Sequence, residues 1–337
     1  RFTPTNTINK LPYEFDTWNV SGSSYVWVRV PVLTSNTCIR AWWGNPLALV
    51  QEPYTIDGSV WTQNFSAVYH LSETSGTIAN ESSASGFDGT LSGGMSGSDW
   101  VSGLVGNGAD FDGAGDHIAN NRSASDLGIN GANPKHISGW IYTRAFNNGG
   151  MFDLGEQGNG QDFCLRTLGG ANNWRAQHWG GGFDYDFNHP SLNTWVYFSH
   201  TYDGTTARTY ADGDALVGSL ATALNTLDND LFRIGYYYGS AAAANAVIDE
   251  MRISTVLRGG DWMHAEWLNM ISNDVFNCYS FVPAIPIVDN AGGATGVTAG
   301  SAFMNGTLVA TGSAPATVAV YWGLTDGGAD PAAWANT

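Results

Sequence analysis

Short apolar runs recur along residues 60–282, and each is bounded by Gly, Asn or Asp. Within runs such as "WVYFSHTYDG", "TARTYADGDALVG" and "AVIDEMRIS", polar positions interrupt the apolar ones at short intervals. A period of two places successive side chains on opposite faces of a strand, so the pattern predicts half-buried β-strands. The Asp-Gly pair at 212–213 is the strongest hairpin signal. The spacing of the runs favours a two-sheet antiparallel sandwich.

One stretch has a helical period instead. In "GGDWMHAEWLNMIS", residues 259–272, the apolar positions recur at intervals of three and four. This spacing predicts one short helix over residues 262–271, with Asp261 as its N-cap. We expect this helix to pack on the edge of the sandwich.

The two ends of the chain carry separate β-like patterns. "SYVWVRVPVL" and "CIRAWWGN" predict two strands joined by the polar turn "TSNT", within a module at residues 1–55. Two strands are too few to hold a core alone, so this module should dock on the sandwich or accept a strand, burying Trp27, Trp42 or Trp43. The Pro- and Gly-rich residues 284–294 predict a linker. Alternation resumes over residues 295–337 and predicts the start of another β-domain.

Composition narrows the function classes. The net charge is −17, with 13 Lys and Arg against 30 Asp and Glu, which argues against a nucleic-acid partner. No apolar run approaches the roughly 20 residues that span a bilayer, so no membrane span is predicted. Charged residues make up only 13% of the chain, whereas Gly and aromatic residues are plentiful. These features favour an all-β protein with a neutral polar surface, of a kind common outside the cell.

The three cysteines are far apart and lack metal-ligand spacing, which argues against a zinc site built on them. We expect Cys38, Cys164 and Cys278 to be buried as small hydrophobic residues. The alternative is one distant disulfide and one free thiol.

An ordered series of blocks carries a family resemblance. "FSAVYHLSETSGTIANESSASGFDGTL", "GNGADFDGAGDHIA", "TYDGTTARTYADGD", "FRIGYYYG" and "AVIDEMRISTVLRGGDWMHAEWLN" resemble, in this order, LamG-like jelly-roll domains of the concanavalin A type from bacterial surface proteins. The resemblance implies a jelly roll over residues 56–283 that frequently binds carbohydrate, often holds structural calcium and usually lacks catalysis. Residues 1–55 resemble the C-terminal half of a small β-domain that often precedes such jelly rolls. "MNGTLVATGSAPATVAVYWGLTDGG" is similar to part of a fibronectin type III-like repeat.

Two adjacent carboxylates lie within the last strand-like run. Neighbours on a strand point to opposite faces, so Asp249 and Glu250 should not act as a catalytic pair. The chain also lacks the Glu-x-Asp-x-x-Glu spacing of jelly-roll glycosidases, so we predict no catalytic residue. Asp249 is either a calcium ligand or an acceptor for backbone N–H groups. Glu250 is expected to form a surface ion pair with Arg252.

Other carboxylates lie in oxygen-rich loops that suit calcium. Glu81 and Asp88 lie in "NESSASGFDG", and Asp112 and Asp116 lie in "DFDGAGDHI". The second loop is no EF-hand, because Ala and Asn occupy its fifth and twelfth positions. Glu81, Asp88, Asp112 and Asp249 are therefore our candidate calcium ligands.

A glycan site needs exposed aromatic rings beside polar groups. "NNWRAQHWGGGFDYDFNH" and a later Tyr supply the candidates Trp174, His178, Trp179, Tyr185 and Tyr237. The alternative is that these side chains fill the core, as aromatic residues in sandwiches mostly do.

These observations favour a non-catalytic extracellular module of a bacterial surface protein that acts in adhesion or carbohydrate binding, with a glycan or other surface ligand as its partner. One alternative is a structural subunit of a filament or surface layer, which would self-associate. Another is the accessory binding region of a polysaccharide-degrading enzyme.

Overall fold

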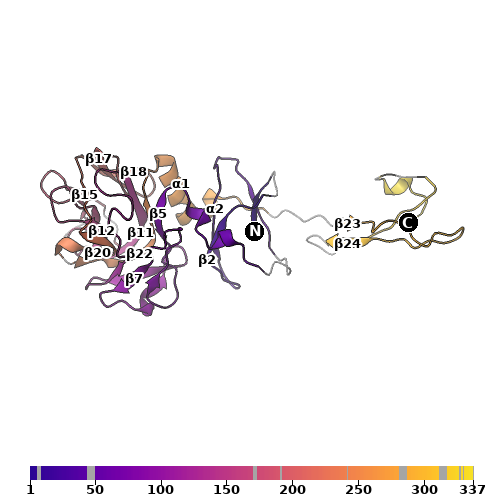
Figure 1. Cartoon of the computed structure of the whole chain (residues 1–337), viewed down its shortest axis with the longest axis horizontal. Helices are drawn as coiled ribbons and strands as arrows, with labels where there is room; N and C mark the ends of the chain where they lie inside the picture. Colours follow the sequence, from indigo (N-terminus) through magenta and orange to yellow (C-terminus); the bar gives the residue numbers. More distant parts are fainter. Residues whose placement is uncertain are drawn as a thin grey trace. The chain divides into compact units, whose positions relative to one another are not determined.

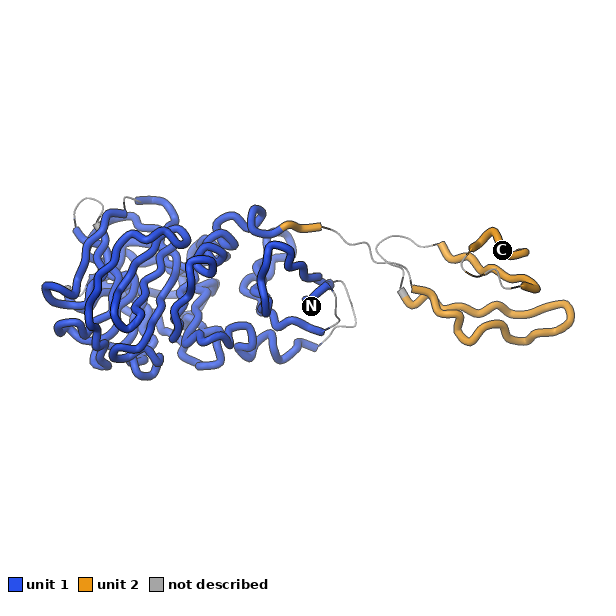
Figure 2. Tube along the Cα trace, turned by 90° about the horizontal axis from the view of Figure 1, so that it is seen from above, with its two compact units in different colours: residues 1–277 blue, residues 278–337 orange. Residues whose placement is uncertain are grey.

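The chain folds into two compact units, residues 1–277 and residues 278–337 (Figure 2). The computed structural model describes residues 1–5, 9–43, 50–169, 173–189, 192–240, 242–280, 287–310, 317–325, 328 and 330–336. In the second unit, β23 (Ile287–Asp289) pairs with β24 (Thr307–Ala310), and a 3₁₀ turn, η5, spans Pro331–Ala333. Because β23 lies within the predicted linker, part of that segment is a strand. Residues 284–286 of the same prediction lie outside the described residues.

Two antiparallel sheets form the sandwich of the first unit (Figure 1). The strands of the eight-stranded sheet are β5 (Phe65–Tyr69), β8 (Trp100–Ser102), β9 (Asn107–Asp112), β11 (Lys135–Ala145), β16 (Trp195–Tyr202), β17 (Thr206–Ala211), β18 (Ala215–Ala221) and β22 (Asn245–Ser254). The strands of the ten-stranded sheet are β6 (Ile78–Ala79), β7 (Gly89–Ser92), β10 (His117–Ala119), β12 (Gly150–Gly155), β13 (Cys164–Thr167), β14 (Asn173–Gln177), β15 (Tyr185–Asn188), β19 (Asp230–Ile234), β20 (Tyr236–Tyr237) and β21 (Ala242–Ala243). The described pairings are antiparallel except for a short parallel contact between β12 and β21. The predicted all-β sandwich is confirmed.

The main core lies between the two sheets. Ile248 and Ile253 of β22 face it, and so does Phe198 of β16, which stacks on Phe152 of β12 with ring centroids 6.2 Å apart. Met251 of β22 also faces this core, whereas Asp249, Glu250 and Arg252 lie on the outer side of the eight-stranded sheet. These outer residues position the site described below.

Helix α1 (Gly260–Ile271) covers part of that outer face. Its Met263 packs against Trp140 of β11 and Tyr197 of β16 in a second, smaller core. The predicted helix is therefore present, but it covers a sheet face and not the sandwich edge. Gly259 is its N-cap, and Asp261 lies in its first turn. A further short helix, α2 (Asn273–Phe276), and four 3₁₀ turns complete the described helices of the first unit: η1 (Pro53–Thr55), η2 (Ser59–Trp61), η3 (Gly97–Asp99) and η4 (Tyr238–Ser240).

The N-terminal segment, residues 1–43 as described, forms two small two-stranded sheets. Strand β1 (Phe2–Pro4) pairs with β4 (Ile39–Ala41), and β2 (Tyr13–Thr17) pairs with β3 (Tyr25–Val28). The two predicted strands are thus present in part, but they do not pair with each other across the "TSNT" turn. Each pairs with a strand closer to the N-terminus. Residues 44 and 45 of the prediction lie outside the described residues.

The cysteines differ in their surroundings. Cys164 is buried as expected, whereas Cys38 and Cys278 are exposed, and all three are free thiols. The prediction of three buried cysteines is therefore wrong for two of them. Among the residues that the structure describes, the helices are too short or too polar to cross a membrane.

A matched pair of leucine substitutions tests the position of the main core. Leu165 of β13 is fully buried, whereas Leu216 of β18 is 55% exposed. We expect Leu165→Ala to lower the free energy of unfolding by about 2–5 kcal/mol, because it removes buried methyl groups and leaves a cavity. Leu216→Ala should change it by about 0.5 kcal/mol or less. Urea denaturation of both variants measures the difference, and equal losses would contradict this assignment of the core.

Candidate functional site

Strand β22 departs from regular alternation at Glu250. Ser138 of β11 pairs with Arg252 and Trp140 pairs with Asp249, so β22 has one extra residue between these pairs. Glu250 is the bulged residue, and its backbone has a left-handed conformation with a φ of 53°. Ile248 and Met251 on either side both face the main core. The bulge therefore leaves Asp249 and Glu250 together on the outer side of the sheet, and the prediction that they lie on opposite faces is wrong.

Glu250 forms a buried ionic cluster with its neighbours. It accepts hydrogen bonds from Arg252 Nη2 at 2.7 Å and from His70 Nδ1 at 2.9 and 3.1 Å. Arg252 also pairs with Glu266 of α1. Glu250 is only 1% exposed, so the expected pair with Arg252 exists but is buried under the helix and the N-terminal segment.

These contacts shift the pKa values of the cluster. Burial by itself would lower the pKa of His70, but Glu250 and Glu14 raise it well above its usual value. Burial would raise the pKa of Glu250, but His70 and Arg252 hold it below its usual value. The pair is therefore a carboxylate and an imidazolium in the folded protein.

Trp27 and Trp61 connect the N-terminal segment to this cluster. Trp27 of β3 stacks on His70 with centroids 5.6 Å apart and an interplanar angle of 11°. The Arg252 guanidinium lies 4.5 Å from the Trp27 ring centroid and 5.0 Å from that of Trp61. Trp61 in turn donates a hydrogen bond of 2.7 Å to Glu14 of β2. We use the name junction for the residues that meet here: Glu14, Asp16, Trp27, Trp61, His70, Glu250 and Arg252.

The contacts of the junction confirm that the N-terminal segment docks on the jelly roll. Figure 1 shows this segment beside α1. Of the three tryptophans expected in this contact, Trp27 lies in it. Trp42 and Trp43 remain 45% and 76% exposed. Arg29, two residues after Trp27 and just beyond the end of β3, donates a hydrogen bond to the Ser59 carbonyl, so it adds to the contact made by Trp27.

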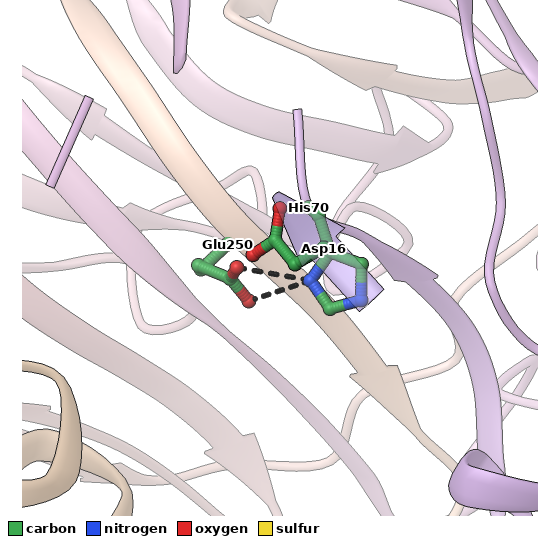
Figure 3. Close-up of side chains that lie close together, drawn as sticks. All are labelled: Asp16, His70 and Glu250. Atoms are coloured by element: carbon green, nitrogen blue, oxygen red, sulfur yellow. Dashed lines mark hydrogen bonds and ion pairs between the residues drawn. The ribbon is translucent and has the colours of Figure 1, made fainter. Parts of the chain in front are cut away.

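Asp16 is the remaining residue of the junction. Figure 3 shows its carboxylate beside Glu250 and the His70 ring, and one ligand atom of each residue lies within 4.8 Å of the others. Trp27 Nε1 donates to Asp16 Oδ2 at 3.2 Å. Burial raises the pKa of Asp16 to about 6, against the opposing effects of His70 and of the Trp27 donor.

A pocket of about 530 Å³ opens beside the junction. Trp18 and Phe15 line this pocket, and their rings pack edge to face. The two side chains are 64% and 44% exposed. Its walls carry carboxylates, an amide and hydroxyl groups from these residues: Glu14, Asp16, Thr17, Ser72, Glu73, Thr74, Ser75, Asn80 and Ser82. Sequence reasoning missed this site because Trp18 and His70 belong to different modules and share no spacing motif.

The four predicted calcium ligands all bond backbone N–H groups. Glu81 Oε1 accepts from Val68 and Ser83, and Asp88 Oδ1 accepts from Glu81 itself. Asp112 Oδ1 accepts from the amide of residue 114. Asp249 Oδ2 accepts from the amides of residues 104 and 105, which is the second of the two roles considered for it. Among the described residues, some groups of three metal-ligating side chains lie close together, but none of these groups contains any of the four. Calcium binding by these four residues therefore stays a prediction.

The predicted sugar-binding aromatics do not form one exposed platform. Trp174 lies in the main core, and His178 is fully buried with its Nε2 3.1 Å from His200 Nε2. Tyr237 is 5% exposed and lies under Arg166. The remaining two, Trp179 and Tyr185, are only half-buried. For Trp174 the structure agrees with the alternative that aromatic residues fill the core, because β14 turns that side chain inward.

Substitution of Trp27 tests the junction. We expect Trp27→Ala to lower stability by about 2–3 kcal/mol, because it removes a cation–π contact and a partly buried ring. Amide hydrogen exchange of residues 9–43 should then become faster while β11 and β16 stay protected. Trp43→Ala, at an exposed ring, is the matched control. Unchanged exchange in Trp27→Ala would contradict docking through this residue.

Buried His178 predicts acid sensitivity. Burial lowers its folded-state pKa to about 4, below the unfolded value of about 6.5. The unfolded chain therefore takes up a proton first, and stability should fall as the pH falls from about 6.5 to 4, by at most about 1.4 kcal/mol per pH unit for this residue. His178→Gln should flatten this slope in urea titrations, and His264→Gln, at an exposed position, should keep it. Parallel slopes for all three proteins would refute the prediction.

Comparison with known proteins gives the fold. Residues 112–261 match the model of a family described as the concanavalin A-like lectin/glucanases superfamily. No curated protein matches the sequence. A sialidase from Trypanosoma rangeli in complex with the inhibitor DANA aligns with a TM-score of 0.47 and 14% identity over 63% of this chain, which spans only 33% of the sialidase chain. Domain 4 of a GH43 extracellular arabinanase from Geobacillus stearothermophilus, in complex with arabinotriose, aligns with a TM-score of 0.42 and 17% identity over 60% of this chain and 97% of that domain. The strand topology and the family match together identify the sandwich as a concanavalin A-like jelly roll.

Proposed function

We propose that this chain is a non-catalytic carbohydrate-binding module of an extracellular adhesive protein, and that the glycan binds in the pocket beside Trp18. The observation that carries the proposal is the pairing of two exposed aromatic rings with polar groups in one pocket. A lectin-like jelly roll supports a glycan ligand at the level of the fold alone.

The pocket has the chemistry that a sugar requires. The apolar C–H faces of a pyranose pack on an aromatic ring, and its hydroxyl groups bond to amides and carboxylates. Trp18 offers the larger exposed ring. Glu73 and Asn80 lie in the same pocket, and Glu73 Oε1 orients Asn80 by accepting from its side-chain amide at 2.9 Å.

Two of the three junction carboxylates, Glu14 and Glu250, favour binding over hydrolysis. A glycosidase needs one carboxylic acid with a raised pKa and a second, free carboxylate across the scissile bond. Glu14 accepts hydrogen bonds from Trp61 and Ser82, and its pKa is held below its usual value, against the effect of burial, by His70 and these donors. Glu250 is occupied by two cations. These two acids therefore support the structure of the junction.

A structural role in an assembly is the second candidate. The N-terminal segment exposes Trp43, Val32 and Leu33 at 76%, 71% and 55%. Such apolar side chains on one small segment favour contact with another protein surface. In this role the chain would associate with copies of itself.

Substitution of Trp18 tests the glycan site. We expect the full chain to bind members of a glycan array, and Trp18→Ala to weaken the best of these interactions at least tenfold, about 1.4 kcal/mol. Trp43→Ala is the control, since this exposed tryptophan lies outside the pocket. The bound glycan should be recovered uncleaved. Absence of binding, combined with concentration-dependent sedimentation, would instead support the structural role.

A further inference from the structure

Asp16, His70 and Glu250 come from three separate parts of the chain and meet beside the pocket, which Asp16 and His70 line. Their ligand atoms lie within 4.8 Å of one another (Figure 3). Zinc binds imidazole nitrogen and carboxylate oxygen at about 2.0–2.2 Å, so two ligands of one zinc ion are separated by at most about twice that distance. The three groups are therefore near the spacing that one small divalent ion requires.

The charges at this point leave room for a cation. Glu14, Asp16, Glu250 and Glu266 surround two basic groups, His70 and Arg252. Glu250 and Glu266 both pair with Arg252. Among the described residues, Glu14 and Asp16 form no ion pair with a lysine or an arginine, so their negative charge is available to a cation.

Several buried polar atoms near Asp16, His70 and Glu250 lack a hydrogen-bond partner among the described residues, and Arg252 Nε is one of them. His70 is 5% exposed, and its Nε2 has no such partner, with the nearest carboxylate oxygen of Glu14 at 3.8 Å. Asp249 Oδ1, on the neighbouring residue of the bulge, is also unpaired. His70, Glu14 and Asp16 all line the pocket, so an ion has a route to the cluster.

A second group of three close ligands, Asp153, Asp162 and Cys164, is less suited to an ion. All three residues are completely or almost completely buried. Burial raises the pKa of both Asp153 and Asp162, which disfavours their charged forms. Asp16 and His70 line the pocket beside the junction, whereas none of these three residues does.

We propose that Asp16, His70 and Glu250 form a binding site for a first-row divalent metal ion of the zinc class. The ion would take the place of the hydrogen bond between the imidazole and Glu250. An imidazole ligand favours zinc over calcium, which prefers an all-oxygen site. This inference is independent of the proposed glycan function.

Metal titration of the full chain tests the proposal. The protein is treated with EDTA, dialysed, and titrated with Zn²⁺, Mn²⁺ or Ca²⁺ by calorimetry, in a Cys38→Ser, Cys278→Ser background that removes the two exposed thiols. We expect one Zn²⁺ per chain, bound more tightly than Mn²⁺ or Ca²⁺. Asp16→Asn and His70→Gln should each weaken Zn²⁺ at least tenfold.

Two controls locate the ion. Glu73→Gln changes an acid of the same pocket outside the cluster, and Cys164→Ser changes the second group of ligands, so both should bind Zn²⁺ normally. Circular dichroism checks the fold. Asp16 is half-buried, so Asp16→Asn decides the question if His70→Gln does not fold. Absence of Zn²⁺ binding, equal binding by Asp16→Asn, or tighter binding of Ca²⁺ than of Zn²⁺ would each overturn the proposal.

Discussion

The buried guanidinium of Arg252 holds together the three parts of the first unit. It extends from the outer face of the jelly roll, pairs with Glu250 on its own strand and Glu266 on α1, and lies against Trp27 of the N-terminal segment. A buried charge is costly unless its donors are satisfied, and removal of one partner typically costs about 3–5 kcal/mol. The helix and the N-terminal segment are therefore required around this residue, and each depends on the other to keep water away from it.

The bulge at Glu250 makes that arrangement possible. A regular strand would turn one of the two adjacent carboxylates into the apolar core. The left-handed backbone at Glu250 keeps both outside, where Asp249 binds the amides of residues 104 and 105 and Glu250 meets His70. A non-glycine residue in this conformation is strained, and the surrounding ion pairs compensate for it. The strained residue also forms part of the proposed metal site, as strained residues at functional sites often do.

Carboxylates in this protein have two distinct uses. Acids such as Glu81 and Asp88 bind backbone amides and fix loops of the sandwich. Acids of the junction instead face imidazole, guanidinium and indole groups from distant segments. Composition cannot separate the two uses, because it does not report which distant side chains meet in the folded chain. For this reason calcium was predicted at carboxylates such as Glu81 and Asp88, whereas Asp16 and His70 were not predicted as metal ligands.

The local pattern of side chains determined the strands, the hairpin at residues 212–213 and the helix that ends at Ile271, because period and turn chemistry depend only on neighbours in the chain. The tertiary structure decided which strands pair in residues 1–43, where β22 bulges, and which aromatic rings are covered. It also brought His70 to Glu250, 180 positions away. Such contacts depend on sheet register and on the burial of one module by another, and no short-range pattern encodes them. The fold was therefore readable from the sequence, whereas the candidate site existed only once distant segments had packed around Arg252.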